Sequence, residues 1–414
     1  MAKISEARHI VTGYFNDSRV IRTLLVVISI TLCATVARLL TFDRYFPFVD
    51  YSDEVVYIAL ADEVRGFSNQ APLREQYGSL APLYVSTNVI VHSIHDALKS
   101  HLWHIPGEYL YSMHLLSVLF GVCTALTMTW IGWQLSGSLA AILSGLVWAL
   151  SPVVVEFNSL ALPDPMLYLA CALSVASAIA AWQRKSLRFL MISLGCGIAA
   201  IYLKLWIVTA IVPFIMTSLA LIVRNRQKFL LRITLLYGSA ILFAIHFIIV
   251  VNPLQNTNKI SDNLSSGSFL ANLFDVSRLL NNLWHIAYTI DGGMGLSFVI
   301  LALGITAYLY SRYKRLIIPD TGSLWIVGTY IIATWWLSAG ISRVDLGTAG
   351  RMRHIFPIVV AFVPFWCVYL EQIVVAGRQL LRRNLGQTSL IRWAVAASGQ
   401  CLGDRVCAGQ LADY

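Results

Sequence analysis

Long apolar runs separated by short polar connectors form the main pattern of this chain. Several of these runs reach the length of about 18 residues at which a helix can cross a bilayer. The alternating segments of a transmembrane β-barrel are absent from the sequence. We therefore predict an all-α polytopic membrane protein with about ten transmembrane helices. The predicted spans cover residues 20–41, 110–134, 138–160, 165–182, 188–203, 205–223, 231–251, 295–311, 322–340 and 355–376.

Two long segments lie between these spans. Residues 42–109 form the first, and within it the apolar stretch 80–98 is interrupted by two histidines and an aspartate, which indicates a helix lying along the membrane surface. Residues 252–294 form the second, which is rich in Asn and Ser and predicts a flexible outer loop. This loop could be a lid over a site or a plain flexible connector, and the sequence leaves both interpretations open.

Charge predicts the orientation of the helices. When the N-terminus is placed in the cytoplasm, the cytoplasmic connectors and the tail 378–414 carry most of the 30 basic residues and few of the 21 acids. This asymmetry follows the positive-inside rule, so the net charge of +9 encodes orientation and indicates no nucleic-acid partner. The chain is 57% hydrophobic and 12% charged, against about 25% charged for soluble domains. We expect a multi-pass protein of the inner or plasma membrane, with membrane lipids around it.

Acidic residues fall at two places on the predicted extracytoplasmic face. Asp53 and Glu54 follow the first span, and Asp164 stands between two prolines where the third span ends and the fourth begins. Acids at these positions could simply cap helices. Two carboxylates from different helices could also perform acid–base chemistry or share one divalent ion, for which Asp53 and Asp164 are the candidate ligands.

Cations occur on the same face, where basic residues are otherwise scarce. Lys204 stands alone between two apolar runs, and it could extend to the interface or bind a phosphate. Arg351, Arg353 and His354 form a denser cluster before the last span, which favours phosphate recognition.

Other cofactor signals are weak. Five histidines between residues 92 and 114 lack a convincing ligand pattern, and the seven cysteines lack metal or redox spacing. The sequence contains no Walker A motif and no dinucleotide fingerprint. No cofactor is therefore assigned, and a divalent metal ion is left open.

Short motifs in a fixed order resemble those of the GT-C glycosyltransferases, which include protein O-mannosyltransferases and aminoarabinose transferases of lipid A (the family 39 and 83 type). The motifs are an acidic pair followed by Tyr and Ala, a Pro-Leu step, a Ser and Gly in the second span, a Ser-Pro and Asp stretch, and a late Arg and Pro. They lie at Tyr51–Ala61, Ala81–Tyr84, His114–Gly121, Ala149–Pro152 with Leu162–Leu167, and Gly350–Pro357. The chain departs from the family at His114, where Arg is usual, and at His354, where Tyr is usual.

The resemblance covers about residues 20–375 and implies a GT-C-like catalytic domain over residues 1–377. It implies inverting transfer of a sugar from a polyprenyl-phosphate donor to a glycan, lipid or protein acceptor at the extracytoplasmic face. Asp53 would be the general base with Glu54 beside it, and Asp164 would position the acceptor or share a metal. Lys204 and the late basic cluster would hold the donor phosphate. A transporter or lipid flippase, with the same charges lining a path, and a non-catalytic scaffold are the alternatives.

Overall fold

The computed structural model describes residues 18–42, 52–66, 81–98, 108–204, 208–224, 226–246, 272–291, 296–313, 319–341 and 348–384. Every regular element within these ranges is a helix, which confirms the all-α prediction for the described part of the chain. The helices are α2 (Ser18–Phe42), α3 (Ser52–Val64), α5 (Pro82–Leu98), α6 (Glu108–Leu135), α7 (Ser138–Leu150), α8 (Pro152–Phe157), α9 (Asp164–Arg184), α10 (Leu187–Leu203), η1 (Val208–Ile211), α11 (Val212–Arg224), α12 (Arg226–His246), α15 (Val276–Asp291), α16 (Leu296–Tyr313), α17 (Thr321–Ile341) and α18 (Thr348–Asn384).

Five helices are long and apolar enough to cross a membrane. Within the described residues these segments are Val20–Thr41, Tyr109–Leu135, Asp164–Arg184, Leu296–Tyr313 and Ile355–Gln379. The other predicted spans coincide with shorter or less apolar helices. The fold is that of a polytopic membrane protein, while the count of ten spans stays a prediction.

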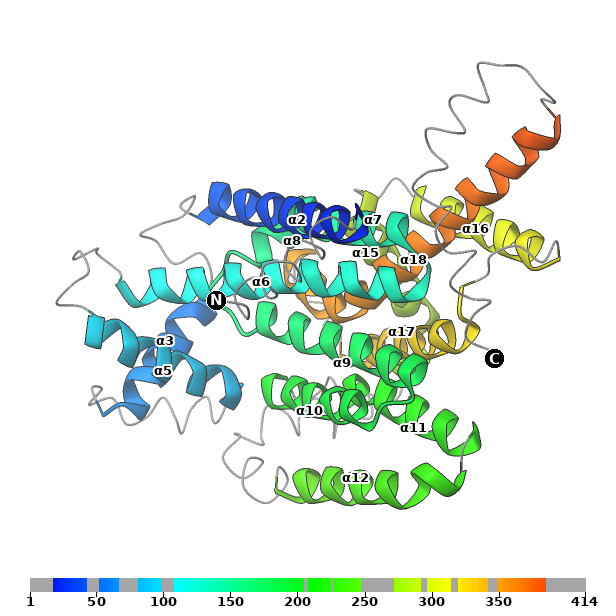
Figure 1. The fold of residues 1–414 in the computed structure, drawn as a ribbon. Coiled ribbons are helices and arrows are strands. Elements are labelled where there is room, and N and C mark those ends of the chain that lie inside the picture. The colour runs from blue at the N-terminus through cyan, green and yellow to red at the C-terminus, as the bar shows by residue number, and fades with distance from the viewer. Residues whose placement is uncertain are drawn as a thin grey trace, which may run out of the picture.

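The centre of the bundle is formed by α6, α9 and α18. Buried residues make up 78% of the most apolar window of α9 but only 11% of that of α2. Figure 1 shows the same arrangement, with α2 and α12 on opposite sides of the bundle and α6 and α9 between them. Trp148, Tyr168 and Phe356 bring α7, α9 and α18 together through edge-to-face contacts, with ring centroids 5.3–6.4 Å apart.

The predicted span 138–160 is broken into two helices, α7 and α8. Pro152 has no N–H group, so the carbonyl of Trp148 loses the donor four residues ahead of it. The Arg38 guanidinium, whose side chain is fully buried, instead donates to the carbonyl oxygens of Trp148 and Ala149, each at 3.4 Å. A cation at this helix end also complements the helix dipole. The break turns the chain towards Asp164.

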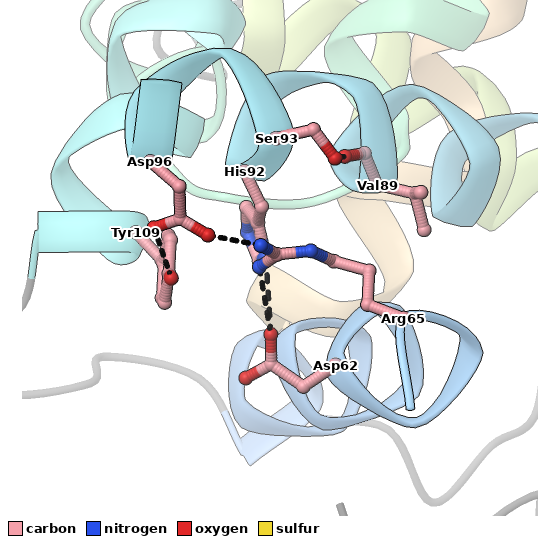
Figure 2. A network of polar contacts seen from close by, with 7 residues as sticks. All are labelled: Asp62, Arg65, Val89, His92, Ser93, Asp96 and Tyr109. Atoms are coloured by element: carbon pink, nitrogen blue, oxygen red, sulfur yellow. Dashed lines mark hydrogen bonds and ion pairs between the residues drawn. The ribbon is translucent and has the colours of Figure 1, made fainter. Parts of the chain in front are cut away.

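In the described part of the first long segment two helices, α3 and α5, lie together at one end of the bundle (Figure 1). The predicted helix 80–98 therefore exists as α5. A polar network joins these two helices to the start of α6 (Figure 2). Arg65, directly after α3, pairs with Asp96 of α5, which also accepts a hydrogen bond of 2.6 Å from the Tyr109 hydroxyl of α6. The network fixes α3 and α5 against the bundle.

The second half of the predicted flexible loop 252–294 contains helix α15. The Asn282 amide on this helix donates to the Ser338 hydroxyl of α17 at 2.9 Å. The Ser151 hydroxyl donates to the Thr289 carbonyl, also at 2.9 Å. Residues 276–291 are therefore packed on the bundle, while 247–271 and 292–295 lie outside the described residues.

Candidate functional site

Glu54 is a buried carboxylate in the first turn of α3. Its side chain has 0% exposure, and its Oε1 accepts a hydrogen bond of 2.7 Å from the backbone N–H of Ala161. The Nε2 atom of His114 on α6 lies 3.1 Å from the same oxygen. Capping of a helix is a local interaction, whereas these contacts reach 107 and 60 positions along the chain. Glu54 thus joins α3 to α6 and to the segment before α9.

Tyr84 of α5 lies against this carboxylate. The ring is fully buried and makes an edge-to-face contact with Tyr57 of α3, with centroids 5.2 Å apart. Burial raises the pKa of Tyr84 well above its usual range, and the nearby Tyr57 and Glu54 raise it further. The phenol is therefore neutral at physiological pH. It gives the Glu54 region a polar group that carries no charge.

Asp164 is the second buried carboxylate, at the first position of α9. Pro163 is the cap residue of this helix and no side-chain hydrogen bond caps it, so simple capping by Asp164 is not what the structure has. The carboxylate pairs instead with the ammonium group of Lys204, and its Oδ1 accepts a hydrogen bond of 3.3 Å from the Tyr168 hydroxyl. Asp164 has 0% exposure and Lys204 has 12%. The pair is a buried acid beside a cation that reaches the surface.

The two carboxylates are linked by a short segment. Ala161, which holds Glu54, stands three residues before Asp164. The chain from α8 to α9 is itself fixed by a hydrogen bond of 2.8 Å between the Ser159 hydroxyl and the Thr41 hydroxyl of α2. The fold therefore brings Glu54, Asp164 and Lys204 to one end of the bundle.

Four predicted site residues have side chains outside the described part of the structure. Asp53 precedes Glu54 on α3, so its backbone is at the site. Arg351, Arg353 and His354 lie in the first turns of α18. Their roles stay predictions, because no contact of these four side chains is described.

The sequence analysis missed two features of this region. Arg38 is an arginine within the first predicted span, and such a cation requires a partner, which is the signal that could have identified it. His92 had been grouped with histidines that lack a ligand pattern, yet it is buried, stacks on Tyr109 at 4.2 Å and lies 3.4 Å from the Asp62 carboxylate (Figure 2). The spacing of residues in the sequence could not predict the partners of Arg38 or His92, because these partners are distant in sequence.

A divalent ion fits the described residues only in part. Among the side chains that the structure describes, no group of three or more His, Cys, Asp or Glu residues is placed to hold a metal. An ion shared by Asp53 and Asp164 would compete with the Lys204 ammonium for the Asp164 carboxylate. We therefore derive no step through a metal.

The comparisons with known proteins support the fold. No protein-family model matches the sequence, and neither does a curated protein. A crystal structure of the Archaeoglobus fulgidus oligosaccharyltransferase in its apo form matches with a TM-score of 0.50 and 11% identity, over 92% of this chain and 54% of that chain. The archaeal oligosaccharyltransferase AglB from Archaeoglobus fulgidus, in complex with an inhibitory peptide and a dolichol-phosphate, has a TM-score of 0.49 and 12% sequence identity. That match covers 90% of this chain and 53% of that chain. This chain thus spans about half the length of these structures, and it shares the fold of an oligosaccharyltransferase over most of its own length.

Proposed function

We propose that this protein is a membrane glycosyltransferase that moves a sugar from a polyprenyl-phosphate donor to an acceptor at the extracytoplasmic face, with inversion. One observation carries the proposal: at one end of a helical bundle a buried carboxylate, Asp164, pairs with Lys204, and a second buried carboxylate, Glu54, is held by the segment just before Asp164. Ionisable groups inside a membrane bundle are costly and commonly mark functional sites. The shared oligosaccharyltransferase fold supports the same reaction class.

Residues in the first turn of α3 activate the acceptor. An acceptor hydroxyl oxygen forms a bond to the anomeric carbon, and its proton passes to the Asp53 carboxylate. Glu54 is held by Ala161 and His114, so it fixes the turn that carries Asp53. Glu54 is a positioning residue in this scheme, and Asp53 is the base.

The leaving group is the polyprenyl phosphate. The bond between the anomeric carbon and the phosphate oxygen breaks, and the oxygen keeps the electron pair. Cations near this oxygen stabilise the charge that develops on it. Lys204 is held by Asp164 and has some exposure, and Arg351, Arg353 and His354 are the further candidates for the donor phosphate.

The orientation follows the charge pattern, and the extent of the domain follows the GT-C resemblance. The N-terminus lies in the cytoplasm, residues 1–377 form the catalytic domain, and the basic tail 378–414 is cytoplasmic. The acceptor is a glycan, a lipid or a protein, and the polar residues of the first outer segment 42–109 would contribute to choosing it.

The experiment is a comparison of lipid-linked sugars and envelope glycans by mass spectrometry, with the gene deleted in its native host and then restored. Wild type should restore one glycan and consume one lipid-linked sugar, whereas Asp164→Asn and Lys204→Met should restore neither. Asp320→Asn is the matched control, because this exposed acid contacts Trp182 at the opposite end of α9. Unchanged glycans and lipid-linked sugars in the deletion strain would refute the proposal.

A further inference from the structure

Helix α15 exposes a continuous apolar stripe. Its members are spaced four residues apart, which places them on one face of the helix. We call Val276, Leu280, Trp284 and Tyr288 the α15 stripe; their exposed fractions are 65%, 60%, 50% and 41%. A row of large apolar side chains this exposed is unusual on a surface that faces water.

The opposite face of α15 is buried and mixed in character, with polar side chains beside the apolar Ile286, which is 1% exposed. Asn282, His285 and Thr289 have exposures of 2%, 5% and 4%. Asn282 donates to Ser338, and the Thr289 hydroxyl donates to the carbonyl of His285 at 2.9 Å. A helix on a soluble protein buries its apolar face and exposes its polar face. Helix α15 instead exposes four large apolar side chains and buries three polar ones, as expected where the solvent is hydrocarbon.

Neighbouring segments also expose apolar side chains. Phe274, 70% exposed, makes an edge-to-face contact with Trp336 of α17, with ring centroids 5.9 Å apart. Helix α16 follows α15 and is a candidate membrane span that exposes Leu296, Val299 and Leu303 by 51–56%. Helix α15 contacts this candidate span, so apolar side chains are exposed on both of two neighbouring helices.

The start of α15 is polar and well ordered by hydrogen bonds. Asp275 precedes the helix and accepts hydrogen bonds from the backbone N–H and the hydroxyl of Ser277, at 2.9 and 2.7 Å. Arg278 lies 3.4 Å from the same carboxylate. The indole N–H of Trp336 donates to the Leu273 carbonyl at 3.0 Å. Charged residues and tryptophans of this kind are typical of the boundary between headgroups and acyl chains.

We propose that α15 lies in the membrane interface, with its stripe against the acyl chains of the bilayer lipids. The helix has 16 residues that include Arg278, two asparagines and a histidine beside its apolar stripe, and such an amphipathic composition is typical of a helix that lies in the interface without spanning the bilayer. Residues 276–291 then anchor the long segment between α12 and α16 to the lipid and are not part of a mobile lid. The proposal requires a membrane protein but not the glycosyltransferase activity.

The test uses spin labels on the full-length protein in lipid vesicles, in a background whose seven native cysteines are replaced. Leu280→Cys and Trp284→Cys place labels on the stripe. Leu303→Cys on α16 is the control expected to face lipid, and Arg188→Cys, exposed in the first turn of α10, is the control expected to face water. Labels at 280 and 284 should collide more with molecular oxygen than with a water-soluble nickel chelate. The label at 303 should behave in the same way, and the label at 188 should show the opposite preference.

Two results would overturn the proposal. Greater access of the nickel chelate at 280 and 284 would place the stripe in water. Low access of both reagents would show that another segment or a second copy of the chain covers it. If the cysteine-free background fails to fold, tryptophan fluorescence of the protein with its native cysteines provides the test. The difference in fluorescence between wild type and Trp284→Phe gives the signal of Trp284. Lipids brominated on their acyl chains should quench this signal and acrylamide should not, and the reverse pattern would equally refute lipid contact.

Discussion

The ion pair between Asp164 and Lys204 provides a test of how the candidate site is built. Asp164 has no exposure and Lys204 has 12%, so the two single substitutions should differ in cost. Lys204→Met leaves a fully buried carboxylate without its cation, whereas Asp164→Asn leaves an ammonium group that can extend towards the surface. Removing one partner of a buried pair costs about 3–5 kcal/mol. We expect Lys204→Met near the upper end of this range and Asp164→Asn near or below the lower end.

The double variant distinguishes pairing from mere proximity. The double variant Asp164→Asn with Lys204→Met has no buried charge at this place. Its loss in free energy of unfolding should therefore be smaller than the sum of the two single losses, with a coupling of about 1–3 kcal/mol. The measurement is reversible unfolding in detergent for wild type, both single variants and the double variant, with Asp320→Asn as the control. Additive costs, with a coupling near zero, would refute the idea that Lys204 is held by Asp164.

Three further predictions concern other residues. Asp53→Asn should abolish sugar transfer with normal expression and membrane insertion, and near-normal turnover of the purified variant would exclude Asp53 as the base. Burial lowers the pKa of His92, partly opposed by its neighbour Asp62, so the unfolded chain binds this proton more readily than the folded protein. The stability contributed by neutral His92 is therefore present above about pH 6.5, and it is lost as the pH falls through the lower pKa of the folded protein. The thermal midpoint of unfolding should drop over this pH window in wild type and should drop less in His92→Gln. Arg38→Met should cost about 2 kcal/mol or more, because the carbonyls of Trp148 and Ala149 lose a charged donor, and Arg38→Lys should recover part of this in the same unfolding assay. Equal stability of Arg38→Met and wild type would contradict that role.

The helices and their approximate ends were predictable because hydrophobic runs are a local property. The predicted spans 20–41, 110–134 and 165–182 correspond to α2, α6 and α9 within a few residues. The hydropathy of the run 138–160 predicts one span although Pro152 interrupts it, because hydropathy does not register a missing N–H donor. The helix α15 was missed, because its polar residues resemble those of a loop until the face they occupy is known.

The candidate site was predictable in part. Glu54, Asp164 and Lys204 were identified because charged groups are rare in an apolar chain, and the structure brings these three to one end of the bundle. Their partners were not predictable. Ala161 contributes only a backbone N–H, which no side-chain motif reports, and the choice between capping and pairing for Asp164 depends on where α10 ends.

The sequence by itself determined that this is an all-helical membrane protein and which ionisable residues are rare enough to matter. These properties follow from composition and period, which each segment carries alone. Only the tertiary structure decided that Asp164 pairs with Lys204, that Glu54 meets His114 and Ala161, and that Arg38 serves the broken end of α7. These contacts join residues 40 to 111 positions apart, and the energy of a buried charge is set by the packing of several helices at once.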